Sequence, residues 1–157
     1  MSRPVSLRTL GPRDATLMGS VLSMFGAAFG ETGTYSCARP STGYLERLLG
    51  RDTFIALAAV EGSRVVGGVA AYVLPKFEQE RSEIYIYDLA VAETHRRQGI
   101  ATAMIAELQR IGALRGAHAV FVQADQGDEP AIALYTKLGA REDVIHFDIA
   151  TATSMPR

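Results

Sequence analysis

The stretch IYIYDLAVAETHRRQGIATAMIAELQRI, residues 84–111, changes its hydrophobic period half way along. Its first part is rich in Ile, Tyr, Leu and Val and predicts a β-strand over residues 83–91. Apolar residues then recur at helical spacing at Ile100, Met104, Leu108 and Ile111. This face predicts an amphipathic helix that ends at Gly116. A strand that leads closely into such a helix is typical of an α/β domain.

Outward from this stretch, the same patterns predict further elements on both sides. Strands are expected at 5–10, 53–60, 65–74, 119–123 and 143–149, and helices at 12–29, 42–49 and 130–138. The turn at 61–64 joins two of these strands into an antiparallel hairpin. We expect residues 150–157 to be a loose tail. This order of elements predicts one α/β domain with a mixed sheet.

The bulk composition narrows the class of protein. The 157-residue chain has a net charge of −1, which argues against a nucleic-acid-binding protein. Cys37 is the only cysteine, so no disulfide framework is expected and a reducing, cytoplasmic setting is the default. No apolar run approaches the length of a membrane span. The three histidines show no metal-ligand spacing, so no metal is expected.

Residues 96–101, RRQGIA, stand where the predicted helix begins. The first N–H groups of a helix lack a partner within the helix, and the peptide dipoles add partial positive charge there. Gly99 has no Cβ, which lets a ligand approach the backbone, and Arg96 and Arg97 add full charges. These features suit a phosphate or pyrophosphate. The alternative is a helix cap with two solvated arginines, and the segment alone does not separate the two.

The order of the elements, the strand IYIYDLAV, the R-x-x-G-x-A of Arg96, Gly99 and Ala101, and the later PAIALYTKLGA resemble the GNAT superfamily of N-acetyltransferases. LPKFEQERSEIYIYDLAV, HRRQGIAT, QADQGDEPAIALYTKLG and HFDI are similar to its aminoglycoside 3-N-acetyltransferases, the gentamicin-acetylating type. The resemblance implies a single GNAT-like domain over 1–157. Its mixed, mostly antiparallel sheet is expected to be flanked by about four helices.

The resemblance also implies where acetyl-CoA binds. The strand at Leu89, Ala90 and Val91 is expected to bulge away from its neighbour, pair with the pantetheine arm and polarise the thioester carbonyl. The pyrophosphate is expected on the loop formed by Arg96, Arg97, Gln98, Gly99, Ile100, Ala101 and Thr102. This agrees with the anion site that the residues themselves suggest.

Two catalytic residues are implied. Tyr135 matches the family tyrosine that protonates the CoA thiolate, and the flanking motif favours this role over that of a core aromatic in its short helix. Many relatives carry a glutamate where this chain has Tyr87, so Asp88 is the nearest carboxylate that could take the proton of the amine. Its alternative role is structural, as an acceptor that holds the strand bulge.

Acidic residues suit a cationic acceptor. The candidates for substrate binding are Glu83, Asp125, Asp128 and Glu129, each of which could instead be a solvated surface acid. At the position of Asp128, relatives often have an asparagine that contacts the cofactor. An ionised aspartate cannot donate a hydrogen bond in its place.

The expected function is therefore acetyl-CoA-dependent acetylation of the 3-amino group of aminoglycosides such as gentamicin. Transfer is direct in a ternary complex and confers antibiotic resistance, with a homodimer as a possible assembly. Two alternatives stay open. The chain could acetylate another small polyamine or a peptide amine, or it could be a non-catalytic relative that only binds CoA.

Overall fold

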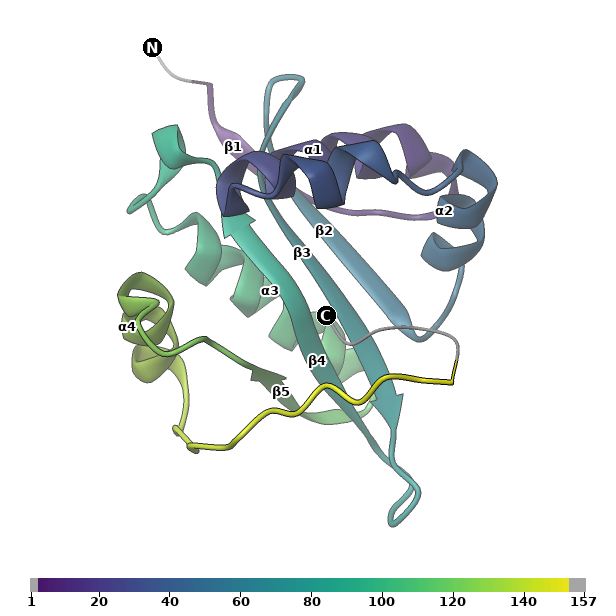
Figure 1. Ribbon diagram of the computed structural model, residues 1–157, viewed down its shortest axis with the longest axis vertical. Helices are drawn as coiled ribbons and strands as arrows, with labels where there is room; N and C mark the ends of the chain where they lie inside the picture. The colour runs from purple at the N-terminus through teal and green to yellow at the C-terminus, as the bar shows by residue number, and fades with distance from the viewer. Residues whose placement is uncertain (1–2, 153–157) are drawn as a thin grey trace. The chain divides into compact units, whose positions relative to one another are not determined.

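The computed structural model describes residues 3–152 of the chain (Figure 1). Its helices and strands are β1 (Val5–Thr9), α1 (Ala15–Phe29), α2 (Thr42–Leu49), β2 (Phe54–Glu61), β3 (Arg64–Pro75), β4 (Ser82–Val91), α3 (Ile100–Leu114), β5 (Ala117–Val122) and α4 (Glu129–Leu138). Short 3-10 turns lie at Pro12–Asp14 and Glu93–His95, and a π-helical turn lies at Gly33–Cys37. The chain forms two compact units, residues 3–123 with the whole sheet and residues 124–152 with α4.

The five described strands form one open sheet in the order β1-β2-β3-β4-β5. The first three pairings are antiparallel, and β4 and β5 run parallel because α3 connects them. The expected α/β class, with a mixed and mostly antiparallel sheet flanked by helices, is confirmed. A single domain over 1–157 stays a prediction.

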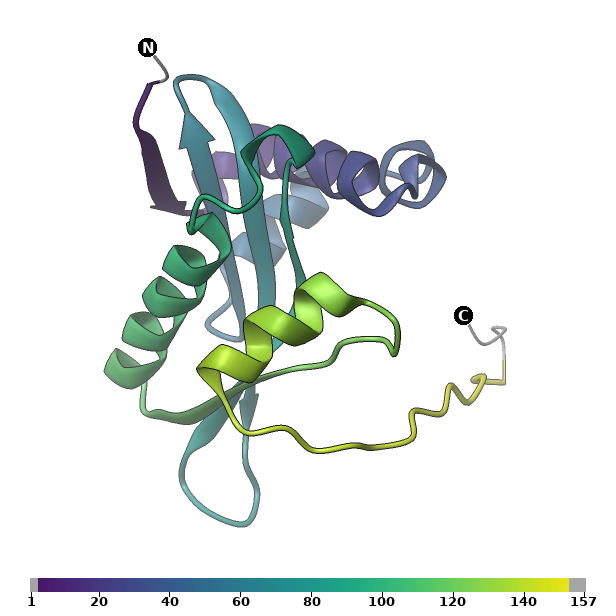
Figure 2. The ribbon, with the colours of Figure 1, turned by 90° about the vertical axis from the view of Figure 1, so that its left-hand side faces the viewer.

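Helices cover the two faces of this sheet, α1 and α2 on one side and α3 on the other (Figure 2). Two neighbouring glycines of β3 show how closely the helices α1 and α3 pack against the sheet. A Cβ at Gly68 would lie 2.8 Å from Val21 of α1, and one at Gly67 would lie 3.3 Å from Met104 of α3. Val21 and Met104 are fully buried, so the sheet is sandwiched between two apolar layers.

Local signals explain where the helices begin and end. Ser41 caps α2 by accepting a hydrogen bond from the Tyr44 N–H at 3.2 Å, and the helix ends at Leu49, as predicted. Helix α1 ends at Gly30, whose φ of 67° is the left-handed conformation that glycine tolerates best. These two caps set the end of α1 and the start of α2, and they bound the segment 31–41 that connects the two helices.

The predicted strand over residues 143–149 is wrong, because residues 140–151 have no regular secondary structure. Within this segment, His146 Nε2 lies 3.1 Å from Asp148 Oδ1, and Arg141 Nη2 donates to Asp143 Oδ1 at 2.8 Å. Alternation of apolar residues suggested a strand, but a strand also needs a hydrogen-bonded neighbour. Residues 153–157 of the predicted tail lie outside the described part of the chain.

Over residues 3–152, no helix combines the length and the apolar character that crossing a membrane requires.

Candidate functional site

Strand β4 has a free edge along its second half. Its parallel pairing with β5 runs from Ser82 to Ile86, and β5 then ends at Val122. Beyond that point, residues 88–91 pair, among the described strands, only with β3. Their backbone N–H and C=O groups that face away from β3 are open to an extended ligand. The role expected of Leu89, Ala90 and Val91 in binding the cofactor stays a prediction.

The irregularity in this strand lies at Tyr87. Asp88 pairs with Ala70 and Ile86 pairs with Ala71, so β4 has one residue more than β3 at this point. Such a bulge shifts the alternation of side chains from one face to the other. Ile86 is buried on the α3 side, whereas Ala70 and Ala90 belong to the cluster around α1. The extra residue therefore directs Asp88 to the α1 face, two residues before the position that the sequence suggested for the bulge.

Asp88 has a specific partner on that face. Its Oδ2 accepts a hydrogen bond of 2.9 Å from the Tyr35 hydroxyl. Tyr35 comes from the π-helical turn Gly33–Cys37 and its ring packs against Phe25 and Phe29, at centroid distances of 6.1 and 5.8 Å. The aromatic cluster thus fixes the hydroxyl in front of the carboxylate.

The surroundings of Asp88 favour its protonated form. Burial raises the pKa of the Asp88 carboxyl above its usual value, and the charge of Glu31 raises it further. The hydrogen bond from Tyr35 acts in the opposite direction and lowers this pKa. A carboxylate with a raised pKa is a stronger base than an ordinary aspartate, which suits proton abstraction near neutral pH.

The loop after β4 leads into a helix start that no side chain caps. Helix α3 begins after Gly99, whose φ is 79°, and Arg97 is also left-handed at 61°. By contrast, Ser41 caps α2 and Asp128 caps α4. The N–H groups of residues 100–102 have no acceptor within α3 and lie at the positive end of its dipole. This arrangement is compatible with the anion site expected from the sequence, which stays a prediction.

Two contacts anchor this loop to the sheet. Arg96 Nε donates to the Val91 carbonyl at 3.2 Å, which ties the guanidinium to the end of β4. His95 Nε2 lies 3.1 Å from Glu61 Oε2 at the end of β2, and both side chains are largely buried. The side chains of Arg97 and Gln98 are exposed. Arg96 is therefore held in place, and Arg97 is the more adaptable cation.

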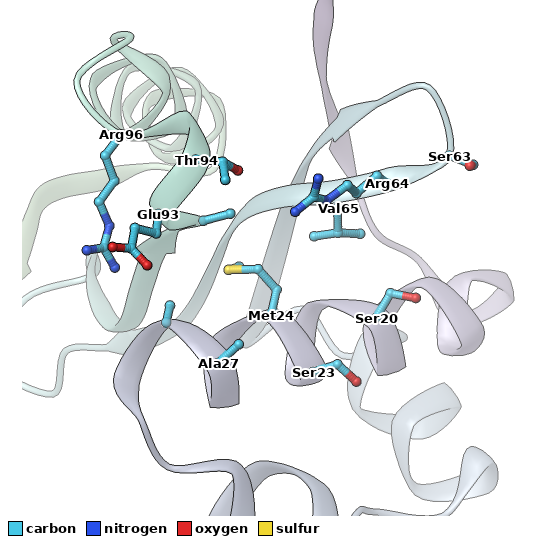
Figure 3. A pocket seen from close by; sticks show the side chains of 12 residues that line it. Ser20, Ser23, Met24, Ala27, Ser63, Arg64, Val65, Glu93, Thr94 and Arg96 are labelled. Atoms are coloured by element: carbon cyan, nitrogen blue, oxygen red, sulfur yellow. The ribbon is translucent and has the colours of Figure 1, made fainter.

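A hollow of about 660 Å³ borders the loop and is walled by α1, the β2–β3 turn and residues 92–96 (Figure 3). Figure 3 shows Arg96 and Glu93 on one wall and Arg64 across the hollow from them. Hydroxyl groups complete the lining at Ser20, Ser23, Ser63 and Thr94. Arg64 is thus a further source of positive charge beside this hollow.

The second unit contains Tyr135 and Asp128. Asp128 Oδ1 accepts a hydrogen bond from the Ala131 N–H at 3.4 Å, so its carboxylate serves as the N-cap of α4. Burial raises the pKa of the Tyr135 hydroxyl, and the Asp128 charge raises it further. Tyr135 therefore stays protonated at neutral pH, as a proton donor must.

The predicted acidic residues divide into different settings. Glu83 lies at the other end of β4 from Asp88, roughly 16 Å away along the strand, and it faces Lys76 at 3.6 Å and His118 at 3.4 Å. Asp125 and Glu129 are exposed in the second unit. Among the described residues, no group of three or more His, Cys, Asp and Glu side chains could hold a metal ion. Glu31 is the acidic residue that acts on Asp88.

Sequence reasoning missed Tyr35 and Arg64 as site residues. Tyr35 lies 53 positions before its partner Asp88, in a segment that reads as a loop, so no local spacing connects them. Arg64 is the first residue of β3, directly after the hairpin turn. Its place in the sequence indicated only that turn and no functional role. Only the fold brings these side chains to the site.

We predict that two substitutions shift the pKa of Asp88 in opposite directions. Tyr35→Phe removes the hydrogen bond to the carboxylate and should raise this pKa, whereas Glu31→Gln removes a negative charge and should lower it. Tyr44→Phe, on exposed α2, is the matched control and should leave it unchanged. NMR titration of the Asp88 carboxyl measures all three. If the pKa of Asp88 shifted in the same direction in both variants, the effects assigned to Tyr35 and Glu31 would be wrong.

Comparison with known proteins identifies the family. The acetyltransferase (GNAT) family profile matches residues 21–140. An aminoglycoside acetyltransferase from an uncultured soil metagenomic sample is 57% identical and superposes with a TM-score of 0.93, covering 95% of this chain and 99% of its own. A second one from such a sample, solved in complex with sisomicin, is 30% identical with a TM-score of 0.87, covering 94% of this chain and 96% of its own.

A curated relative is more distant. The N-alpha-acetyltransferase of Sulfurisphaera tokodaii is 31% identical over 96 residues, which are 54% of this chain. This chain spans only 58% of the length of that relative. The profile match, the soil enzymes and the free edge of β4 beside an uncapped helix start agree: the chain is an acetyltransferase of the GNAT family.

Proposed function

We propose that this acetyltransferase uses acetyl-CoA to acetylate the 3-amino group of aminoglycosides such as gentamicin, by direct transfer in a ternary complex. The observation that carries the proposal is the half-buried Asp88 at the free edge of β4, with Glu31 beside it. A cationic amine is attracted by two carboxylates, and one of them has a raised pKa. The sisomicin-bound neighbour supports an aminoglycoside as the acceptor.

The chain's own groups fit acetyl-CoA. In Leu89, Ala90 and Val91, the backbone groups that face away from β3 would pair with the pantetheine arm, and the N–H groups of residues 99–102 would hold the pyrophosphate. Arg96 and Arg97 would add charge there, with Gln98 beside them. Acetyl-CoA supplies the activated acetyl group. A backbone N–H of β4 directed at the thioester oxygen would stabilise the negative charge that develops on it.

Proton transfer completes the reaction. Asp88, directly or through a water molecule, takes a proton from the acceptor ammonium so that the nitrogen lone pair can attack. The N–C bond forms, the C–S bond breaks, and Tyr135 donates its proton to the departing thiolate. The nitrogen then loses its second proton, which restores the Tyr135 hydroxyl, and Asp88 releases the first proton to solvent. Asp125, Asp128 and Glu129 would attract the other ammonium groups of the substrate. We place Glu83 last among the acidic residues, since Lys76 and His118 already contact it.

A peptide amine is the second candidate acceptor. The similarity to an N-alpha-acetyltransferase favours it, although that match covers about half of each chain. Another small polyamine, or CoA binding without turnover, would follow if neither acceptor reacts. We further propose that acetylation removes one positive charge from the antibiotic and thereby confers resistance. The unpaired Cys37 thiol is compatible with a cytoplasmic location, and a homodimer is the proposed assembly.

The reaction is tested by mixing the chain, acetyl-CoA and gentamicin or sisomicin and following the release of free thiol. We expect turnover with the antibiotics and a loss of about 100-fold or more in kcat/KM for Asp88→Asn, since a general base contributes on this scale. NMR of the product locates the acetyl group. Absence of thiol release from correctly folded protein would exclude the aminoglycoside, and a panel of peptide amines and polyamines then separates the alternatives.

The anion site is tested with the two glycines that flank α3, one before its start and one after its end. Gly99 and Gly116 have φ values of 79° and 78°, and a Cβ at either would have no atom within 4 Å. Gly99→Ala and Gly116→Ala should each reduce the free energy of unfolding by about 1 kcal/mol, because an L-residue is strained there. Calorimetry should find acetyl-CoA affinity weakened about tenfold by Gly99→Ala alone. Equal affinities in the two variants would mean that the pyrophosphate binds elsewhere.

Tyr135→Phe should lower kcat roughly 10- to 100-fold, with little change in the affinity for acetyl-CoA. The substitution removes only the group that protonates the departing thiolate. Tyr44→Phe, the same change at an exposed site, should leave both quantities unchanged. Steady-state kinetics and calorimetry measure the two effects separately. If kcat of Tyr135→Phe equals that of the wild type, Tyr135 is a packing residue.

A further inference from the structure

A hydrogen-bonded pair joins the end of β2 to the loop before α3. His95 Nε2 lies 3.1 Å from Glu61 Oε2, and the two side chains keep only 12% and 21% of their surface exposed. The Ala59 side chain lies on the α3 side of the sheet, where a Cβ at Gly67 would lie 3.3 Å from it and from Met104. Side chains alternate along a strand, so Glu61, two residues later, points to the same side and reaches the loop.

Both nitrogens of the His95 ring have partners. Nδ1 lies 2.8 Å from the Thr94 hydroxyl, and Nε2 faces the Glu61 carboxylate. An ionised carboxylate only accepts hydrogen bonds, so Nε2 carries a proton and donates it. The Thr94 hydroxyl can donate to Nδ1 or accept from it, so both contacts persist in the neutral and in the charged ring. The ring is therefore fixed between β2 and the loop.

The loop that this pair holds contains a strained residue. Within residues 3–152, Arg97 is the only residue other than glycine with a positive φ, at 61°. An L-residue keeps this conformation only where its surroundings impose it, and such positions concentrate at functional sites. Two side chains of the loop also bond back to the preceding backbone. Arg96 Nε donates to the Val91 carbonyl at 3.2 Å. Gln98 Nε2 donates to the Thr94 carbonyl at 3.5 Å.

We propose that Glu61 and His95 are positioning residues, which hold the loop in its cofactor-binding conformation before acetyl-CoA arrives. The inference rests on the proposed binding of the pyrophosphate at residues 99–102. A loop that must be ordered on binding reduces the affinity for its ligand. The pair orders this loop on folding instead, because one partner belongs to the sheet and the other directly precedes Arg96. It should therefore act on the affinity for acetyl-CoA and not on proton transfer.

Calorimetry with acetyl-CoA tests the pair. Glu61→Ala should weaken binding about tenfold, because the loop is then ordered only on binding. Glu61→Gln keeps an oxygen that accepts from Nε2 and should retain the affinity within about twofold. Glu107→Ala is the matched control and should leave the affinity unchanged. It removes a glutamate whose carboxylate pairs with Arg110 at 2.6 Å within α3.

The reciprocal substitution shows whether the two residues act together. His95→Ala should weaken binding by a factor similar to that of Glu61→Ala. The double variant should lose no more affinity than either single variant, because all three remove the same contact. Losses that multiply in the double variant would mean that the two side chains act independently, which contradicts the proposal.

Two further measurements separate positioning from a general loss of stability. With an acceptor that turns over, Glu61→Ala should raise the KM for acetyl-CoA and leave kcat at saturation unchanged. In the protein without cofactor, hydrogen exchange should become faster at the amides of His95 and Arg96. These amides donate to the carbonyls of Ala92 and Glu93 at 2.8 and 3.4 Å.

The outcomes distinguish this inference from the proposed function. If Glu61→Ala binds acetyl-CoA as well as the Glu107→Ala control, or if the loop amides keep their wild-type exchange rates, the pair does not position the loop. A Glu61→Gln variant that loses as much affinity as Glu61→Ala would likewise overturn the hydrogen-bonded role. A wild type that binds no acetyl-CoA would contradict the proposed function itself.

Discussion

The extra residue at Tyr87 in the β3–β4 ladder is the constraint on which the candidate site depends. Strict alternation would place Asp88 with Ile86 on the buried α3 side of the sheet, where a carboxylate has no partner. One inserted residue moves it to the α1 face, opposite Ala70 and within 2.9 Å of the Tyr35 hydroxyl. Because β5 ends at Val122, the same stretch of β4 is also free to pair with a ligand. A single bulge thus places the candidate base beside the proposed cofactor edge.

The charges around this point have opposing effects that can be separated. Burial and Glu31 favour the protonated form of Asp88, and Tyr35 favours the ionised form. At the end of β4 the local charge is positive instead, because cationic side chains and the start of α3 lie there. Arg96 is held at this point by its hydrogen bond to the Val91 carbonyl. One end of the strand is therefore suited to phosphate and its middle to an amine. The two reactants of an acetyl transfer differ in charge in the same way.

The sequence predicted what local chemistry determines. The helix over residues 42–49 and the change of period at residues 84–111, which gives β4 and α3, follow from local patterns, whereas the anion site at Gly99 stays a prediction. The sequence did not locate the bulge, because register depends on two strands, and it did not indicate Tyr35, because the fold alone brings it to Asp88. Alternation at 143–149 predicted a paired strand wrongly, since a pattern within one segment contains no information about its neighbour.

The central claim is that Asp88 accepts the proton of the reacting amine. A crystal structure of the chain with CoA and an aminoglycoside tests it most directly, through the distance from the 3-amino nitrogen to the nearest carboxylate. The account predicts an Asp88 oxygen within about 3 Å of that nitrogen, or one bridging water away. It is contradicted if the amine is bound to a different carboxylate while Asp88 contacts only Tyr35.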